Sequence, residues 1–532
     1  MKSTQATRDR DSNRDSAWKS SSASSLRSVW FLGLLAAACG APADRAQTRD
    51  STISLAYCCG ERVLNPMMDT NARMLVFLPL ARHDEKGELE GRLARRWEHS
   101  ADYREWTFHL RTDVLWHDGT PVTGHDVAFT IDLWAHPEVN WYGAAGVEST
   151  AVPDDSTVVI RYGQSTDALQ YQPWLVYYPR HLLEGLDPGE FYDWEFWLRP
   201  VGNGPYRVTR TVPATLMELK ANERHYEGKP PIERVVLRFV DGAGLTELMG
   251  GGVDILTEVE PGQARQLAED PRFRLYHSAS TGMGLAVYWN HRSPPFADPQ
   301  VRRALMLAVN REELRSVLGF PEDMPILDGP FSLRQLARGE ISEPVAYDPV
   351  EAERLLIEAG WVDGDGDGVR ERAGRALRFT ALVSDQPARR QIGVSVQAML
   401  RRVGVHMEVQ SLEGSVVFRK VQAGEFEAAV LPTGIPADWL QHYFGAESLL
   451  GYRSPEVGTL VDRLAINAEP EILDRIFGEL TDIFRRESPA LFLFPSVQFV
   501  LATRRVQGLS SPWRAHPTPY MDALWLEDRR DD

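Results

Sequence analysis

The stretch 93–134 constrains the fold most strongly, because it predicts three different local structures in close succession. Residues 106–111 alternate apolar and polar side chains, which predicts a half-buried β-strand. Residues 117–121 read His-Asp-Gly-Thr-Pro, a combination typical of a tight turn. Thr123 then suits a helix N-cap, and Asp126 follows it at the position of a capping box. The block therefore predicts a strand, a turn and a helix in that order.

Length and composition set the class of protein. The chain has 532 residues, 43% of them hydrophobic, and 15 Trp, which excludes global disorder. At roughly 100–200 residues per domain, this length suggests about three domains. The net charge of −17 argues against nucleic acid as the main partner, because phosphate binding needs clustered positive charge. A mean hydropathy of −0.31 argues against a protein with several membrane spans.

The first 38 residues have the pattern of an export signal. Residues 1–28 are Ser-rich with a net charge of +3, and residues 29–38 are apolar but shorter than the roughly 20 residues that a membrane span needs. The run ends at Cys39, which resembles the lipidated cysteine of a bacterial lipobox, although Leu35 lies one position upstream of the usual place. The alternative is an ordinary cleaved signal with an incidental Cys39. Residues 39–50 then predict a flexible tether, and the mature chain carries −20.

The other two cysteines, Cys58 and Cys59, are adjacent and follow a strand-like run. Neighbouring Cα atoms lie about 3.8 Å apart, below the usual disulfide range of about 4.4–6.8 Å, so a bond between them would be strained. An oxidising compartment would allow such a bond. The alternative is a pair of small residues at a strand end.

Eight segments carry a family resemblance. The first reads LARRWEHSADYREWTFHLRTDVLWHDGTPVTGHDVAFT from Leu93, with Gly124 where Ala is usual. The others follow in order: PDDSTV at 153–158, YPRHL at 178–182, PVGNGPY at 200–206, and related stretches at 222–230, 290–305, 347–361 and 451–457. Together they resemble the signature of the family-5 extracellular solute-binding proteins, the peptide- and nickel-binding receptors of ABC importers.

The resemblance implies an α/β, two-lobed periplasmic-binding-protein fold (type II, cluster C-like) with an extra inserted domain and a ligand cleft between the lobes. Domain I would comprise 51–82, 199–278 and 489–532. Domain II would be 83–198, and domain III, the second lobe, 279–488. Residues 280–284, with two glycines, would lie where the chain crosses between lobes and suit a hinge. The alternative is a plain strand start.

The resemblance also implies a function and partners. The protein would be an exported, lipid-anchored monomer of the bacterial cell envelope, in the periplasm or on the outer face of the cytoplasmic membrane. It would capture peptides by closing its cleft and deliver them to the permease subunits of an ABC importer. Other members of the family carry nickel chelates, haem, opines or sugars. A sensor or chaperone lipoprotein without a transport role is a third reading.

Peptide-binding members pair an aspartate with the α-amino group of the ligand, a charge-assisted bond. It follows a strand that Gly424 to Leu431 resembles here, and Asp438 is the candidate for this role. Two additional residues disturb the family spacing, and the alternative is a solvated loop aspartate or a helix cap. The candidate aromatic walls of the cleft are Trp141, Tyr142, Tyr288, Trp289 and Trp439, each of which could instead pack in the core.

The run Asp363, Asp365 and Asp367, with Gly368 next, resembles the first half of a calcium loop. Position 12 is Gly374 rather than the bidentate Glu, which excludes a complete EF-hand. A distant carboxylate could still finish a structural calcium site, and the alternative is an exposed turn. No other cofactor is expected.

An enzyme is not expected, because the chain lacks the signatures of a phosphate loop, a zinc-protease helix and a nucleophile elbow. His109, His117 and His125 are eight residues apart on a strand, a turn and a helix start, so their spacing does not predict a metal cluster.

Overall fold

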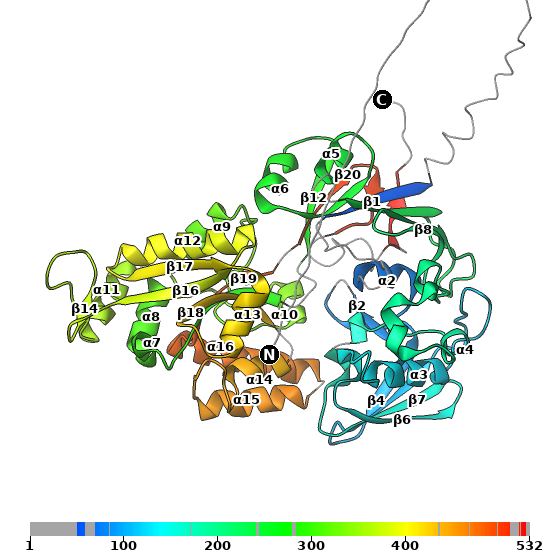
Figure 1. Cartoon of the computed structure of the whole chain (residues 1–532), viewed down its shortest axis with the longest axis horizontal. Coiled ribbons are helices and arrows are strands. Elements are labelled where there is room, and N and C mark those ends of the chain that lie inside the picture. The colour runs from blue at the N-terminus through cyan, green and yellow to red at the C-terminus, as the bar shows by residue number, and fades with distance from the viewer. Residues whose placement is uncertain are drawn as a thin grey trace, which may run out of the picture. The chain divides into compact units, whose positions relative to one another are not determined.

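Figure 1 shows the computed structural model of the chain. The structure describes residues 51–58, 70–84, 86–170, 172–240, 244–278, 283–434, 437–467, 469–496, 498–510, 521 and 523–527. The signal, Cys39, the tether, Cys59 and hinge residues 280–282 lie outside the described residues, as does the side chain of Cys58.

A seven-stranded sheet is assembled from three separated stretches of the chain, so that the blue β1 and the red β20 share a sheet with green strands (Figure 1). The order is β12-β20-β11-β1-β10-β9-β8, and β1 runs parallel to both β10 and β11. The strands are β1 (Thr52–Cys58), β8 (Tyr206–Val212), β9 (Leu216–Ala221), β10 (Arg234–Val240), β11 (Ile255–Val259), β12 (Phe273–Ser278) and β20 (Gln498–Thr503). Its helices are α2 (Thr70–Val76), α5 (Gly244–Met249) and α6 (Pro261–Ala268).

A four-stranded antiparallel sheet of order β4-β5-β7-β6 contains the block that the sequence singled out. Its strands are β4 (Ala94–His99), β5 (Glu105–Leu110), β6 (Val147–Asp154) and β7 (Thr157–Tyr162). In β5 every second side chain is buried, which confirms the predicted strand. The predicted helix is α3 (Gly124–Ala135), which packs on β6 and β7. Its capping box is confirmed: the Asp126 carboxylate accepts the Thr123 N–H at 2.8 Å.

Short elements surround these two sheets. They are β2 (Ala81–His83) and β3 (Leu89–Gly91), α4 (Arg180–Leu183), β21 (Val506–Gln507), β22 (Trp525–Leu526), and the 3-10 turns η2 (Tyr142–Ala144), η3 (Ala168–Gln170), η4 (Gln172–Trp174), η5 (Pro188–Asp193) and η6 (Glu195–Leu198).

A five-stranded mixed sheet forms from the C-terminal half, with the order β17-β16-β18-β13-β19. Its strands are β13 (Met283–Trp289), β16 (Arg378–Ser384), β17 (His406–Leu412), β18 (Ala428–Gly434) and β19 (Ala490–Pro495). β16 runs parallel to β17 and β18, and β13 runs antiparallel to β18 and β19. The sequence placed 489–495 with domain I, but β19 pairs with β13 here, so this boundary was wrong by one strand.

Helices cover both faces of this sheet, and β13, β18 and β19 are buried almost throughout, whereas the edge strand β17 is partly exposed. α12 (Pro387–Arg401) packs with one face, and α13 (Gly414–Gln422) and α14 (Ala437–Phe444) pack with the other. The remaining helices of this half are α7 (Pro294–Ala297), α8 (Pro299–Leu307), α9 (Arg311–Val317), α10 (Leu333–Arg338), α11 (Pro349–Glu358), α15 (Pro455–Ala465) and α16 (Pro470–Glu487), with the small hairpin β14 (Glu371–Arg372) and β15 (Arg375–Ala376). Within the described ranges, no helix combines the length and apolar character that a membrane crossing requires.

Candidate ligand-binding site

The predicted amine partner lies where β18 ends and α14 begins. Asp438 is the second residue of α14, so its backbone sits in the first turn of the helix. Its side chain is outside the described residues, and the amine role therefore stays a prediction. A carboxylate in the first helical turn is favoured by the helix dipole, which accounts for an aspartate at this position without a ligand as well.

Trp439 is half-buried and begins an aromatic stack on α14. Its ring lies 5.2 Å from that of Tyr443, one helical turn later, at an interplanar angle of 30°. Tyr443 stacks in turn on Tyr288 of β13, with centroids 4.8 Å apart. The stack leads from the core to the partly exposed Trp439, which leaves this ring with surface available to a ligand.

Tyr288 and Trp289 fill the core in this structure and do not line a surface. They are 0% and 1% exposed, and as consecutive residues of β13 they point to opposite faces of the sheet. Trp289 stacks on Phe296 with centroids 5.1 Å apart. Burial raises the pKa of the Tyr288 hydroxyl. The sequence could not separate them from cleft residues, because a strand covered on both faces shows no alternation.

Trp141 lies in another part of the molecule and packs against the core that the seven- and four-stranded sheets share. The guanidinium of Arg73, a 2% exposed residue of α2, lies 5.1 Å from the Trp141 ring centroid, a cation–π arrangement. No motif of the sequence marks Arg73 as a neighbour of Trp141. No ring contact joins Trp141 to Trp439 among the side chains that the structure describes, and the side chain of Tyr142 lies outside them.

The histidine of the His-Asp-Gly turn is a structural anchor. Its Nδ1 accepts the N–H of Gly202 at 3.1 Å, and its Nε2 lies 3.1 Å from the carbonyl oxygen of Gly204. Because Nδ1 accepts, the ring is the neutral Nε2–H tautomer and donates to Gly204. Burial lowers the pKa of His117 to about 4. The turn is thereby fixed to the PVGNGPY segment.

That segment is itself held against the end of α2 by a close backbone approach. A Cβ on Gly202 would lie 1.9 Å from the carbonyl oxygen of Val76, so only glycine fits. The N–H of Gly204 donates to the same oxygen at 2.7 Å, and Asn203 accepts the N–H of Leu78 at 2.8 Å. These contacts give the segment a structural role that pattern matching alone did not reveal.

The structure brings the three aspartates of the candidate calcium loop together. Ligand oxygens of Asp363, Asp365 and Asp367 lie within 4.8 Å of one another, and all three residues are exposed. The Glu371 carboxylate turns back toward them, since a Cβ on Gly364 would lie 2.9 Å from its Oε1. The oxygens also accept N–H groups of their own loop. Hard oxygen donors fit calcium, and the site stays a prediction.

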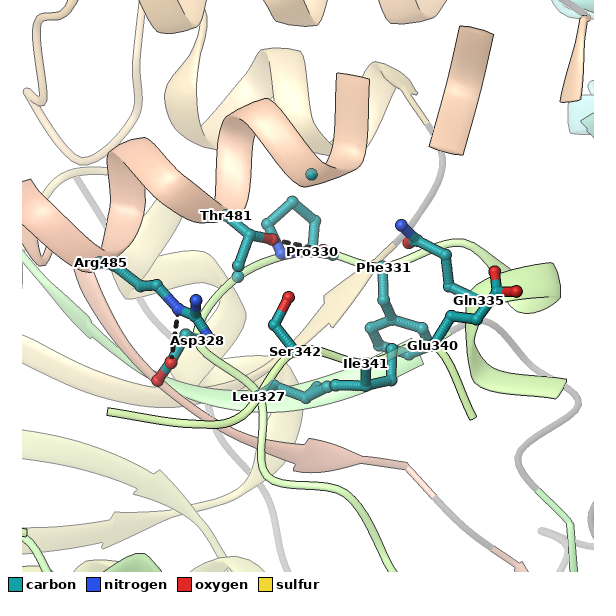
Figure 2. Close-up of a pocket in the computed structure, with 12 residues that line it drawn as sticks. Leu327, Asp328, Pro330, Phe331, Gln335, Glu340, Ile341, Ser342, Thr481 and Arg485 are labelled. Carbon is teal, nitrogen blue, oxygen red and sulfur yellow. Dashed lines mark hydrogen bonds and ion pairs between the residues drawn. The ribbon is translucent and has the colours of Figure 1, made fainter. Parts of the chain in front are cut away.

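A small polar cavity that the sequence did not indicate lies beside a buried carboxylate (Figure 2). Asp328 is paired with Arg311 at 2.7 Å and with Arg485 at 2.9 Å, and it accepts the N–H of Val345 at 2.8 Å. The cavity has a volume of about 30 Å³, enough for one water, whereas ligand pockets measure about 300–1,000 Å³. The ion pairs of Asp328 with Arg311 and Arg485 therefore fix the loop after α9, and the cavity beside them is too small for a ligand.

Comparisons with known proteins find relatives that are described as peptide-binding proteins. The chain is 28% identical over 528 residues to a putative ABC transporter peptide-binding protein of Brucella ovis, covering 93% of this chain and 97% of that protein. It is 24% identical over 386 residues to the oligopeptide-binding protein AppA of Bacillus subtilis, covering 68% of each.

Two solved structures show the same fold. NikZ from Campylobacter jejuni in complex with Ni(L-His) superposes with a TM-score of 0.69 at 22% identity, covering 90% of this chain and 99% of that one. NikA from Brucella suis in complex with Fe(III)-EDTA superposes with a TM-score of 0.76 at 19% identity, covering 90% and 100%. The mixed α/β chain thus has the two-lobed periplasmic-binding-protein fold.

The model of the bacterial extracellular solute-binding proteins, family 5 (Middle), matches residues 88–453, more than half of the chain. This match contains most of the segments on which the resemblance rested, together with the His117 anchor and the β18–α14 junction. The chain belongs to the bacterial extracellular solute-binding proteins, family 5.

Proposed function

We propose that this protein captures peptides outside the cytoplasm and delivers them to the membrane permease of an ABC importer. The observation that carries this proposal is the nearly end-to-end match with relatives named as ABC transporter peptide-binding proteins. The oligopeptide-binding protein AppA supports the same cargo. The fold supplies a scaffold that binds solutes, whereas the choice of peptides rests on these relatives.

The binding mode follows from the chemistry of an extended peptide. Main-chain hydrogen bonds along an added strand supply affinity without reading side chains. Asp438 at the start of α14 pairs with the ligand α-ammonium group, and the half-buried Trp439 next to it supplies an aromatic wall. Trp141 is a second wall candidate.

The change Asp438→Ala tests the amine role. It leaves the ammonium group unpaired, which costs about 1–3 kcal/mol, or roughly 5- to 150-fold in Kd. Isothermal titration with a peptide that wild-type protein retains measures the loss, and the exposed Asp462→Ala on α15 is the matched control. Equal affinity of wild type and Asp438→Ala would remove Asp438 from the site.

Native mass spectrometry of freshly purified protein tests the cargo itself. Co-purifying peptides support the proposal. A co-purifying metal chelate, haem, opine or sugar contradicts the peptide assignment. It favours the alternative of a non-peptide ligand, which the neighbours solved with metal chelates suggest, NikZ with Ni(L-His) and NikA with Fe(III)-EDTA.

Export and anchoring complete the proposal. The protein would act as a monomer, tethered through lipid on Cys39 to the outer face of the cytoplasmic membrane, where the permease lies. Metabolic labelling with an alkynyl fatty acid checks the anchor, because Cys39→Ala should abolish the label and release the protein from the membrane.

A further inference from the structure

The hairpin of β2 and β3 has a turn that lies against the start of α10. A Cβ on Gly87 would lie 3.1 Å from the carbonyl oxygen of Leu333, so the two backbones are in close contact. The Asp84 carboxylate accepts the N–H of Lys86 at 2.7 Å and the N–H of Glu88 at 2.9 Å. These hydrogen bonds fix the backbone that carries the Glu88 side chain.

Glu88 pairs with two arginines of α10. Its Oε1 lies 3.1 Å from Nε of Arg334 and 2.5 Å from Nη2 of Arg338. The side chain of Arg334 is only 11% exposed, and it also lies 3.1 Å from Glu471 and 3.8 Å from Asp474 on α16. Salt and water screen an ion pair with a mostly buried member less than one on an open surface. We call Glu88, Arg334 and Arg338 the latch.

The latch joins two parts of the molecule that have separate hydrophobic cores. The hairpin packs through Leu80 and Leu89 in the core that the seven- and four-stranded sheets share. α10 packs through Leu336, and α16 through Ile476, in the core on one face of the five-stranded sheet. The ion pairs of the latch therefore run from one core region to the other.

His99 of β4 makes a second contact between the same parts. Its Nε2 lies 3.9 Å from a carboxylate oxygen of Glu469, the residue before α16. The opposite face of the five-stranded sheet shares its core with β11, β12 and β20 of the seven-stranded sheet. The five-stranded sheet is thus joined to the rest of the chain by a core on one face, and by polar contacts of the helices that pack on the other face.

The latch can separate without leaving a buried charge unpaired. Arg334 retains Glu471 and Asp474, which lie on its own side of the contact. Glu88 and Arg338 are already 35% and 38% exposed, so both side chains are partly hydrated before the pair breaks. Exposed ion pairs are individually weak and sensitive to salt. These properties suit a reversible contact, in contrast to the buried pair of Asp328 with Arg311.

We propose that Glu88, Arg334 and Arg338 form a reversible latch that holds the two lobes together and shifts the molecule toward its closed form before cargo binds. When only the closed form binds tightly, the measured Kd rises as the fraction of that form falls. The latch therefore sets how tightly cargo is retained without contacting it. This inference goes beyond the proposed function and does not depend on the cargo being a peptide.

The experiment measures the separation of the lobes in the mature full-length protein, freed of cargo by exhaustive dialysis. Spin labels are attached through non-natural amino acids at the exposed Glu148 of β6 and Thr459 of α15, so that the native cysteines stay unchanged. Pulsed electron paramagnetic resonance then gives the distribution of distances between the two labels.

The variants are Glu88→Gln, Arg338→Gln and Arg338→Lys. The matched control is Glu90→Gln, because Glu90 lies on the same hairpin but pairs with Arg82 within it, at 2.6 Å. Far-UV circular dichroism checks that each variant is folded. Wild type is measured at low salt and in about 1 M NaCl, where the screening length falls to about 3 Å.

We expect Glu88→Gln to lower the ratio of closed to open molecules by about 3- to 10-fold, because it removes both ion pairs. Arg338→Gln should lower this ratio by about 2- to 5-fold, since Arg334 still pairs with Glu88. Arg338→Lys keeps the charge and should stay within about 2-fold of wild type. Glu90→Gln should leave the distribution unchanged, and high salt should shift wild type toward the distribution of Glu88→Gln.

Identical distance distributions for wild type and Glu88→Gln would overturn the inference. An equal shift in Glu90→Gln would also overturn it, because the effect would then belong to the stability of the hairpin. The response of wild type to salt needs no variant, so a misfolded protein cannot leave the question open, and an unchanged distribution in high salt contradicts the latch. All these distances are measured without cargo, so their outcome is separate from the test of peptide binding.

Discussion

Two arginines associated with the five-stranded sheet show how differently one protein can bury the same cation. Arg311 is almost fully buried, forms an ion pair with Asp328, and donates hydrogen bonds to the carbonyl oxygens of Leu327, Phe492 and Val345. Arg389 is half-buried, and the structure gives it a hydrogen bond to Ser384 but no carboxylate. The first charge is paired within the chain, whereas the second has no carboxylate partner among the described residues. Burial of a cation is therefore not by itself evidence of an ion pair within the chain.

The largest effect should come from removing the carboxylate that satisfies the first cation. Asp328→Ala leaves Arg311 buried without its counter-ion, and we expect the free energy of unfolding to fall by about 3–5 kcal/mol. Urea denaturation measures it. The matched change Arg389→Gln removes a guanidinium that has no carboxylate partner in the part of the chain that the structure describes, and it should alter this free energy by no more than about 0.5 kcal/mol. Similar losses for both variants would break the comparison.

A smaller effect should come from His117, a half-buried group whose two ring nitrogens have hydrogen-bond partners while the ring is neutral. Its pKa of about 4 in the folded protein lies below its ordinary value of 6.5, so the unfolded chain binds the proton first as the pH falls. The stability from this group is complete above pH 6.5 and is lost as the pH falls to about 4. This group contributes up to about 1.4 kcal/mol per pH unit to the slope of the free energy of unfolding against pH.

His117→Gln should reduce that slope between pH 6.5 and 4, as measured by denaturant unfolding at several pH values. His125→Gln, in an exposed position, is the control and should leave the slope unchanged. An unchanged slope in His117→Gln would show that the ring is not held in its neutral form. The result bears on the comparison of Arg311 with Arg389, because it tests whether burial without a charge partner keeps a titratable group neutral.

The smallest effect should come from calcium, because the three aspartates of the loop are exposed and the usual twelfth ligand is absent. With a Kd of about 10⁻⁴–10⁻³ M, 1 mM calcium would stabilise the protein by about 0.4–1.4 kcal/mol. Thermal unfolding with and without calcium measures it, and Asp363→Asn should cancel the gain. A null response in wild type would make the loop a plain turn.

The sequence predicted the local structures well and the surroundings of side chains poorly. Three features depend only on residues close in the chain, and the sequence could predict them. They are the alternation in β5, the cap of α3 and the proximity of Asp363, Asp365 and Asp367. Tyr288 and Trp289 were read as candidates for the cleft wall, but helices distant in sequence cover both faces of their strand. The assignment of 489–495 erred for the same reason, since the partner of β19 is more than 200 residues away.

The sequence by itself determined the family, the mixed α/β class and the positions of turns and caps, because ordered motifs and short-range hydrogen bonds are properties of neighbouring residues. Only the tertiary structure decided that Asp328 is paired with two arginines and that Arg389 has no carboxylate partner among the described residues. Whether a buried charge has a counter-ion depends on distances between side chains from separate elements, and no local pattern encodes them.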